Sequence, residues 1–256
     1  NINKNFKFNN LKVESAINLD QLIIDKKNLK IKPYLPSFID KIKLEEHKIV
    51  INYNKNKFNI EGNGNVLLED KLDNLSYKIL KDNNNILFDA KIFLKNNSLQ
   101  IDFLDYKKKK NIESLISIKG NYKKDNKLKI DFINLKEMNN EISIKGLNLN
   151  KDFKIVDIKN INFKYKNNKD IINNLNIKKD NSNFIIEGDS FDASKIIDNI
   201  MDSEEEKESF FEHLNPKVNI KIKKTYIDEI NYINNLYGSI NFNNNKINEL
   251  KLESTF

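Results

Sequence analysis

The chain contains no cysteine, no tryptophan and, read from end to end, no arginine. Without cysteine it has neither disulfide bonds nor a cysteine nucleophile. Without arginine it lacks the side chain that nucleic-acid-binding proteins use for bidentate contacts with phosphate and guanine. Its basic residues are therefore all lysines, and the formal net charge is +7. Lysine alternates with Asp, Glu and Asn along most of the chain, so the pattern argues against a nucleic-acid partner.

Long apolar runs are also missing. No stretch of about 18 apolar residues occurs, so we expect no membrane-spanning helix. No hydrophobic segment typical of a signal peptide is present either. The chain opens with "NINKNF" rather than Met and stops at Phe256 inside an alternating pattern. We interpret it as a piece of a longer protein, with any targeting or anchoring segment elsewhere.

Groups that carry chemistry are scarce. There are two histidines, His47 and His213, and neither has a partner at metal-ligand spacing. We interpret His213 as a surface position. Asp189, Asp192 and Asp198 lack the glycine-centred pattern of a calcium loop. No nucleophile stands beside a base in a recognisable motif. The sequence predicts a protein that is not an enzyme and uses no metal or cofactor.

Strict alternation of apolar and polar residues dominates what is present, and it predicts β-strands. Short turns rich in Asn, Asp and Lys separate these runs, and such residues tolerate left-handed turn conformations. The run Lys107 to Lys110 is interpreted as one more solvated turn. The fold class predicted is all-β, a long antiparallel meander over a single elongated region, 1–256.

Two segments interrupt the alternation. "KPYLPSFIDKI" contains Pro33 and Pro36, and it predicts a short helical turn near 36–42 with Phe38, Ile39 and Ile42 on one side. The second segment, "FIIEGDSFDASKIIDNIM", predicts a strand followed by a short capped helix near 192–202. An acidic connection, "DSEEEKES", follows it.

The predicted helix has a specific cap. Asp192 is the expected N-cap, which places Phe191 at N′ and Ile196 at N4, the spacing of a hydrophobic staple. Ile196, Ile197, Ile200 and Met201 share the apolar face, so the helix should cover one patch of sheet.

One short helix cannot cover the apolar face of so many strands. Three solutions stay open: a second sheet closing a sandwich, a bilayer around an outer-membrane β-barrel, or lipid bound inside a curled sheet. Aromatic residues show no girdle at the strand ends, which counts against the barrel.

The second interrupted segment also resembles AsmA-like proteins, and more closely their YhdP/TamB-related branch in its C-terminal AsmA-like region. Residues 184–256 are the most AsmA-like part of the chain. The matching positions are Ile186, Gly188, Phe191, Asp192, Ala193, Ser194, Ile196, Ile197, Ile200, Val218, Ile220, Ile222, Tyr226, Ile227, Leu236, Gly238, Ile240, Ile247 and Leu250.

The resemblance implies an envelope protein of a Gram-negative-type bacterium, periplasmic and anchored to the inner membrane by a segment outside this chain. It implies a taco-like open β-groove that conducts phospholipid between the inner and outer membranes. The partners would be phospholipid acyl chains and the two membranes. The groove candidates are Ile49, Ile51, Phe58, Ile60, Ile86, Phe88, Ile92, Leu99, Ile101, Phe103, Ile130, Phe132, Ile142, Ile144 and Phe163. The alternative is a non-catalytic structural or surface β-sandwich with a closed core.

Overall fold

The computed structural model describes residues 11–25, 32–55, 57–123, 127–201, 215–244 and 246–255, without the side chains of 199–201. The predicted interpretations of His213, of the acidic connection after the helix, and of the side chains of Ile200 and Met201 lie outside the described residues.

The described residues form almost entirely β-structure, as the alternation predicted. The main sheet has 15 strands, and all but β11 follow one path from β1 to β17. The strands of its first half are β1 (Lys12–Asp25), β2 (Lys41–Asn54), β3 (Lys57–Leu67), β4 (Leu72–Asp82), β5 (Asn85–Leu94), β8 (Ser114–Lys123) and β9 (Lys127–Glu137). Those of its second half are β10 (Asn140–Leu149), β11 (Ile155–Asp157), β12 (Asn160–Lys166), β13 (Ile172–Asp180), β14 (Asn183–Asp192), β15 (Lys217–Tyr226), β16 (Tyr232–Asn243) and β17 (Lys246–Thr255).

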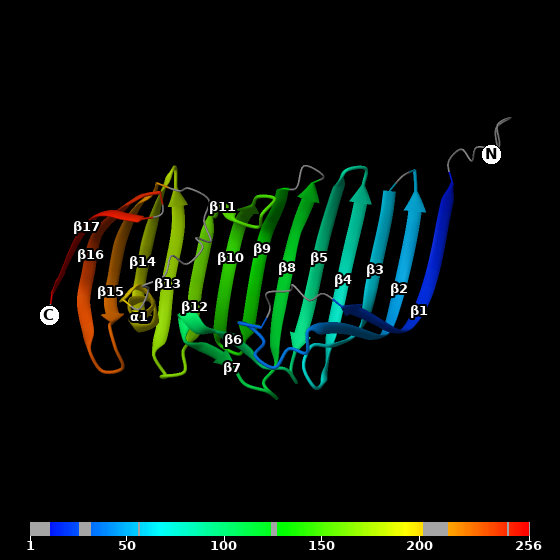
Figure 1. Ribbon diagram of the computed structural model, residues 1–256, viewed down its shortest axis with the longest axis horizontal. Coiled ribbons are helices and arrows are strands. Elements are labelled where there is room, and N and C mark those ends of the chain that lie inside the picture. Colours follow the sequence, from blue (N-terminus) through cyan, green and yellow to red (C-terminus); the bar gives the residue numbers. More distant parts are fainter. Residues whose placement is uncertain are drawn as a thin grey trace.

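The sheet is open. β1 and β17 lie at opposite ends of the molecule, and the strands run across its long axis (Figure 1). Open sheets rarely exceed about ten strands without curling, and this one curls. With about 4.8 Å between neighbouring strands, the sheet measures on the order of 60 Å from β1 to β17.

Neighbouring strands are antiparallel with one exception in the described sheet, the parallel pair of β14 and β15. The long antiparallel meander predicted from the sequence thus contains one parallel step. A parallel pair cannot be joined by a hairpin and needs a longer crossover, commonly through a helix. Helix α1 (Ser194–Met201) lies in that crossover, which explains why one helix occurs among so many strands.

The helix begins one residue later than predicted. The Ile197 N–H donates to the Ala193 carbonyl at 2.9 Å, so Ala193 is the N-cap. Asp192 still caps the helix, because its Oδ1 accepts the Ser194 N–H at 3.0 Å. With Ala193 as the N-cap, Phe191 and Ile196 no longer occupy the N′ and N4 positions of the predicted staple. Phe191 is buried against the ring of Phe163, whereas Ile196 is 38% exposed.

The helical turn predicted near 36–42 is wrong. The segment is a hydrogen-bonded turn in which the Phe38 N–H donates to the Leu35 carbonyl at 2.9 Å. It ends before β2, whose first strand residue is Lys41. Both Leu35 and Phe38 are buried, so the apolar residues here pack as a turn rather than as a helix face. A short 3-10 helix, η1 (Asp102–Leu104), occurs elsewhere.

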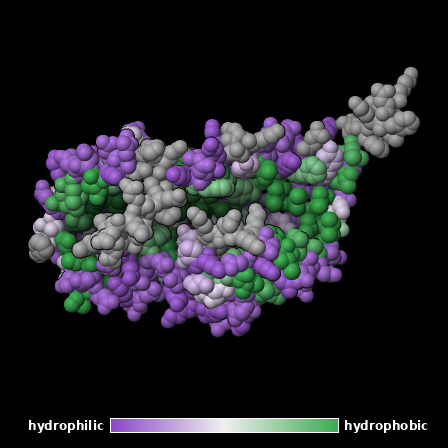
Figure 2. All heavy atoms as spheres, viewed as in Figure 1, coloured by the Kyte–Doolittle hydropathy of each residue, from purple (hydrophilic) through white to green (hydrophobic). Residues whose placement is uncertain are grey.

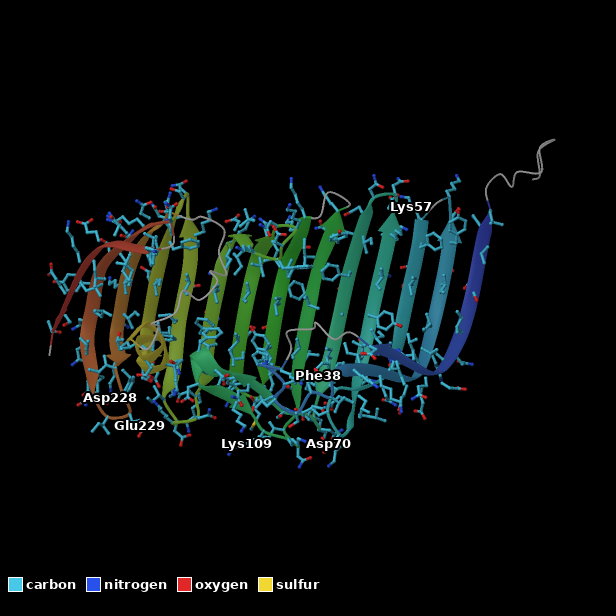
Figure 3. The ribbon with its side chains drawn as sticks, in the orientation of Figure 1. Phe38, Lys57, Asp70, Lys109, Asp228 and Glu229 are labelled. Carbon is cyan, nitrogen blue, oxygen red and sulfur yellow. The ribbon has the colours of Figure 1, made fainter. Side chains whose placement is uncertain are left out.

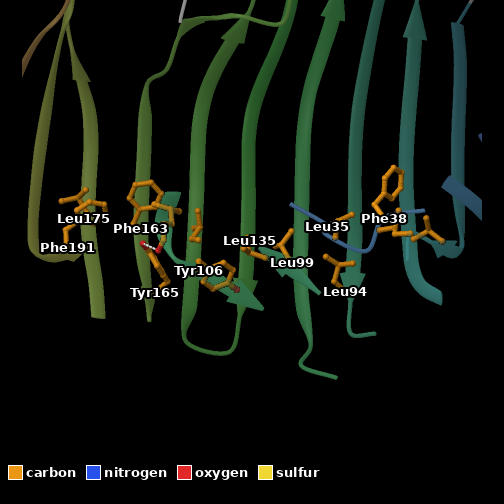
Figure 4. Packing of buried hydrophobic residues seen from close by; sticks show 14 of the residues in the cluster. Leu35, Phe38, Leu94, Leu99, Tyr106, Leu135, Phe163, Tyr165, Leu175 and Phe191 are labelled. Carbon is orange, nitrogen blue, oxygen red and sulfur yellow. Dashed lines mark hydrogen bonds between the residues drawn. The ribbon is translucent and has the colours of Figure 1, made fainter. Parts of the chain in front are cut away.

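The two long edges of the sheet differ in what covers them. We call the edge formed by the turns after β2, β4, β8, β10, β13 and β16 the upper edge, and the opposite one the lower edge (Figure 1). Near the lower edge a two-stranded sheet, β6 (Leu99–Ile101) with β7 (Tyr106–Lys108), lies against the main sheet with η1 and the Leu35–Phe38 turn. Their apolar residues form the larger buried cluster with residues from β2 to β15 (Figure 4).

Candidate functional site: an apolar groove

The register aligns one apolar row across the whole sheet, and we call it the central row. Each residue of it is the direct partner of the next on the neighbouring strand. In order it contains Ile17, Ile49, Gly62, Tyr77, Ala90, Ile118, Ile133, Ile144, Ile161, Ile177, Ile186, Ile220, Gly238 and Leu252. The row passes through the parallel step without interruption, because Ile186 pairs with Ile220.

Apolar residues also flank the central row on both sides. Toward the lower edge the next row contains Leu75, Ile92, Ile116, Leu135, Ile142, Phe163 and Leu175. Toward the upper edge it contains Ile51, Ile60, Ile79, Phe88, Gly120, Ile130 and Leu147. The three rows together form a continuous apolar band on one face.

The opposite face of the same strands is polar. In the outward row next to the central row, Asp89, Lys119 and Lys145 occupy positions on β5, β8 and β10. Side-chain pairs such as Lys78 with Glu61, at 2.7 Å, connect neighbouring strands there. This division places the apolar band on one side only, the side on which both buried clusters lie.

The central row is not fully covered. Ile118, Ile133 and Ile144 lie in the middle of the sheet, yet all three are only half-buried, and the same holds for Ile161, Ile177, Ile186 and Ile220. The interior of a closed sandwich would bury such positions almost completely. Figure 2 shows the hydrophobic band in a hollow between two hydrophilic margins, along the long axis. We call this feature the groove.

Most of the predicted groove residues lie in it. Ile49 and Ile144 belong to the central row, and Ile51, Ile60, Phe88 and Ile130 to the row above it. Ile92, Ile142 and Phe163 belong to the row below. Phe58 and Ile86 lie in a further row at the upper edge, each paired with Lys81.

Four predicted residues lie elsewhere. Leu99 and Ile101 are in the β6–β7 hairpin, and Phe103 is in η1 with 48% of its surface exposed. Phe132 faces the polar side, because its partners are Lys119 and Lys145. The register of β8 with β9 shifts between Lys119 and Gly120, which changes the side that later residues of β9 face.

The sequence interpretation missed central-row residues. Ile118, Ile133 and Ile177 were not among the candidates, although they lie at the centre of the groove. A signal for Ile133 was present: Ile133 and Leu135 resume the alternation one step out of phase with Leu128 and Ile130.

Buried polar groups hold the lower edge together. The Asp73 carboxylate accepts the backbone N–H groups of Lys95 and Asn96, both at 2.8 Å, and of Asn97 at 3.1 Å. It also accepts the Asn97 side-chain amide at 2.6 Å. The fully buried Lys108 ammonium donates to the carbonyls of Lys95 and Asn97, at 3.0 and 2.6 Å. Burial lowers the pKa of Lys108, while Asp73, Glu137 and Glu69 oppose that shift. These contacts fix the β6–β7 hairpin over the lower part of the groove.

His47 is a groove residue of another kind. It is fully buried opposite Leu19, its ring stacks on Tyr77 with centroids 5.9 Å apart, and its Nε2 lies 2.9 Å from the Asn65 carbonyl. With one ring nitrogen at a backbone carbonyl and the other without a described partner, it fills the groove wall as a structural side chain.

The described residues contain no group of three or more His, Cys, Asp or Glu side chains placed to hold a metal ion. Nor does the described part of the chain contain a helix long and apolar enough to span a membrane. The strongest candidate site is therefore the groove. Comparison with known proteins found no match among family models, curated proteins or solved structures.

Proposed function

We propose that this chain is part of an envelope protein that binds phospholipid acyl chains in its groove and conducts phospholipid between the inner and outer membranes. The protein would lie in the periplasm, held at the inner membrane by a segment outside this chain. The continuous, only half-buried central row is the observation that carries the proposal. The resemblance to AsmA-like proteins supports it independently.

The energetics of a groove suit this role. Each CH₂ removed from water contributes about 0.8 kcal/mol, so an acyl chain lying on the band is held against release into water. From β8 to β15 the central row offers an isoleucine on every strand that it crosses. A chain could therefore move along it without leaving apolar contact, and no residue would need to perform covalent chemistry.

A closed β-sandwich is the competing interpretation. It requires a second sheet large enough to cover the band. Within the described residues the second sheet has two short strands, β6 and β7, and it covers only the lower part of the groove. The half-buried isoleucines above it support the lipid-binding proposal.

The proposal is tested by expressing the chain in a Gram-negative periplasm and purifying it without detergent. Native mass spectrometry and lipid extraction then identify bound molecules. Ile133 and Phe132 are adjacent residues that face opposite sides of β9, so Ile133→Asp and Phe132→Asp form a matched pair. Ile177→Asp supplies a second groove variant on a distant strand.

We expect co-purifying phospholipid in the wild type and in Phe132→Asp, with loss in Ile133→Asp and Ile177→Asp. Circular dichroism identifies any variant that fails to fold, which is then left out of the comparison. A folded wild-type chain that carries no lipid would contradict the proposal and favour a protein without a lipid ligand.

A further inference from the structure

We infer that the lipid taken by the groove is an anionic phospholipid, with its phosphate-bearing headgroup at the upper edge of the sheet. This inference rests on the proposed function, because it names the class of lipid for the same groove. It starts from the distribution of charge along the two edges.

The upper edge is rich in lysine. Lysines lie in or close to each of its turns, and among the described residues they outnumber carboxylates along it. The lysines are Lys55 and Lys57 after β2, Lys81 before the β4–β5 turn, Lys123 and Lys127 around the β8–β9 turn, Lys151 and Lys154 after β10, Lys178 and Lys179 at the end of β13, and Lys246 after β16. The carboxylates described at this edge are Asp82, Asp152, Asp157 and Asp180, and Lys179 lies 2.5 Å from Asp157.

The lower edge carries both acidic and basic residues. Its turns carry Glu69, Asp70, Asp170, Asp228 and Glu229 besides lysines. Figure 3 shows Lys57 at the upper edge, and Asp70, Lys109, Asp228 and Glu229 along the lower one.

Some lysines at the lower edge are paired with these acids, whereas Lys71, Lys107 and Lys109 have no carboxylate at ion-pair distance among the described residues. Lys110 lies 2.7 Å from Asp70 and 3.4 Å from Glu69, and Lys166 lies 2.8 Å from Asp170. At the upper edge Lys57 pairs with Asp82 at 2.7 Å. Within the described residues, Lys81, Lys123 and Lys154 have no carboxylate at ion-pair distance. Of these three, Lys81 lies on the groove side of the sheet, and Lys123, which is paired with Asn85, lies on the polar side.

The groove face just below the upper edge has the character of a membrane interface. Lys81 points to the groove side, between Phe58 and Ile86 in the register. In the same row the Tyr53 and Phe58 rings pack with centroids 4.7 Å apart, and Tyr122 pairs with Ile86. Aromatic rings and lysines are common at the headgroup level of bilayers, because their apolar parts lie on apolar surface while their polar ends reach water.

The covering of the lower edge supports the same orientation. The β6–β7 hairpin and the Leu35–Phe38 turn fill the lower part of the groove. A lipid whose acyl chains lie on the central row therefore has its headgroup directed to the upper edge, where lysines outnumber carboxylates. Charge complementarity then selects an anionic headgroup over a zwitterionic one.

The test uses lipid-free chain incubated with vesicles of equal parts dioleoyl phosphatidylglycerol and dioleoyl phosphatidylcholine. The vesicles are removed by centrifugation, and the lipids left on the soluble protein are quantified by mass spectrometry. The triple variant Lys81→Gln/Lys123→Gln/Lys154→Gln alters the upper edge. Lys71→Gln/Lys107→Gln/Lys109→Gln removes the same charge from exposed positions at the lower edge.

We expect the wild type to take up phosphatidylglycerol over phosphatidylcholine by about fivefold or more at low salt. The preference should fall toward parity at 1 M salt, where the Debye length is about 3 Å. The upper-edge variant should lose it, and the lower-edge variant should keep it. Equal uptake of both lipids, or equal losses in both variants, would overturn the inference and leave lipid binding intact. Uptake of neither lipid by folded wild type would instead overturn the proposed function, and the inference with it.

Discussion

Ile186 on β14 and Ile220 on β15 are direct partners across the parallel step of the sheet, and both lie in the central row. Although the chain direction is repeated rather than reversed at this step, the apolar row stays unbroken. Helix α1, in the crossover between them, lies near the lower edge, and Asp192 accepts a hydrogen bond from its first residue, Ser194.

Replacement of Asp192 tests how that crossover is held. Its Oδ2 accepts the Asn167 amide at 2.7 Å, and its Oδ1 accepts the Ser194 N–H, in a buried site. Asp192→Ala leaves both donors without a partner, and we expect a loss of about 2–3 kcal/mol in unfolding free energy. Urea denaturation measures it. The exposed Asp198 of α1 serves as the control, and Asp198→Ala should change stability far less; equal losses would contradict this role of Asp192.

Replacement of Asp73 should destabilise the lower edge. Asp73→Ala leaves the N–H groups of Lys95, Asn96 and Asn97 without their acceptor, so we expect a loss of about 3 kcal/mol or more. The exposed Asp70 makes a surface ion pair with Lys110, and Asp70→Ala should change the denaturation midpoint little. If the two variants have the same midpoint, Asp73 does not hold this edge.

Alkaline pH should destabilise the fold through two buried tyrosines. Burial raises the pKa of Tyr106 and of Tyr165 above the usual value of 10.0, with Glu137 adding to the shift at Tyr106 and Asp192 to that at Tyr165. Both stay protonated in the folded chain while the unfolded chain ionises. The contribution of the two protonated tyrosines to the free energy of unfolding is therefore complete below pH 10, and it is lost as the pH rises above 10.

Thermal denaturation between pH 8 and 11 measures this loss. The double variant Tyr106→Phe/Tyr165→Phe should be less stable at pH 8, because Tyr165 donates to the Leu104 carbonyl at 2.9 Å and Tyr106 to Glu137. Its stability should nevertheless decline less steeply above pH 10. The exposed Tyr34→Phe is the control. Identical slopes in all three proteins would refute the prediction.

Gly120 should tolerate no side chain. A Cβ there would meet the Lys129 backbone carbonyl, at the place where the β8–β9 register shifts. We expect Gly120→Ala to cost about 2 kcal/mol of unfolding free energy. At Gly62 a Cβ would meet the outer end of the Tyr77 side chain, which can move. Gly62→Ala should therefore cost less, and the reverse order by urea denaturation would contradict the reasoning.

Alternation predicted the strands well, because most strands have one apolar and one polar face. It placed Ile49, Ile60 and Ile144 correctly on the groove side. It placed Phe132 on the wrong side, because alternation is counted along one strand and a register shift changes the count. The faces of β9 depend on its partners, so they follow from pairing rather than from composition.

Two other features depend on contacts between distant residues. Leu99 and Ile101 alternate like any other strand residues, but they belong to a separate hairpin held by Asp73 and Lys108. The parallel step also cannot be recognised from the sequence pattern, since β14 and β15 alternate in the same way as antiparallel strands. The helix between them was the visible sign, and its connection with strand direction becomes clear only from the pairing.

The parallel step also sorts charge. In a continued meander β15 would run upward, and the turn that carries Asp228 and Glu229 would interrupt the line of lysines. Because β15 repeats the direction of β14, that acidic turn lies at the lower edge and Lys246 at the upper one. The crossover thus omits one reversal of chain direction. As a result, the lysine-rich turns stay at the upper edge and the acidic turns at the lower edge, from the first strand to the last.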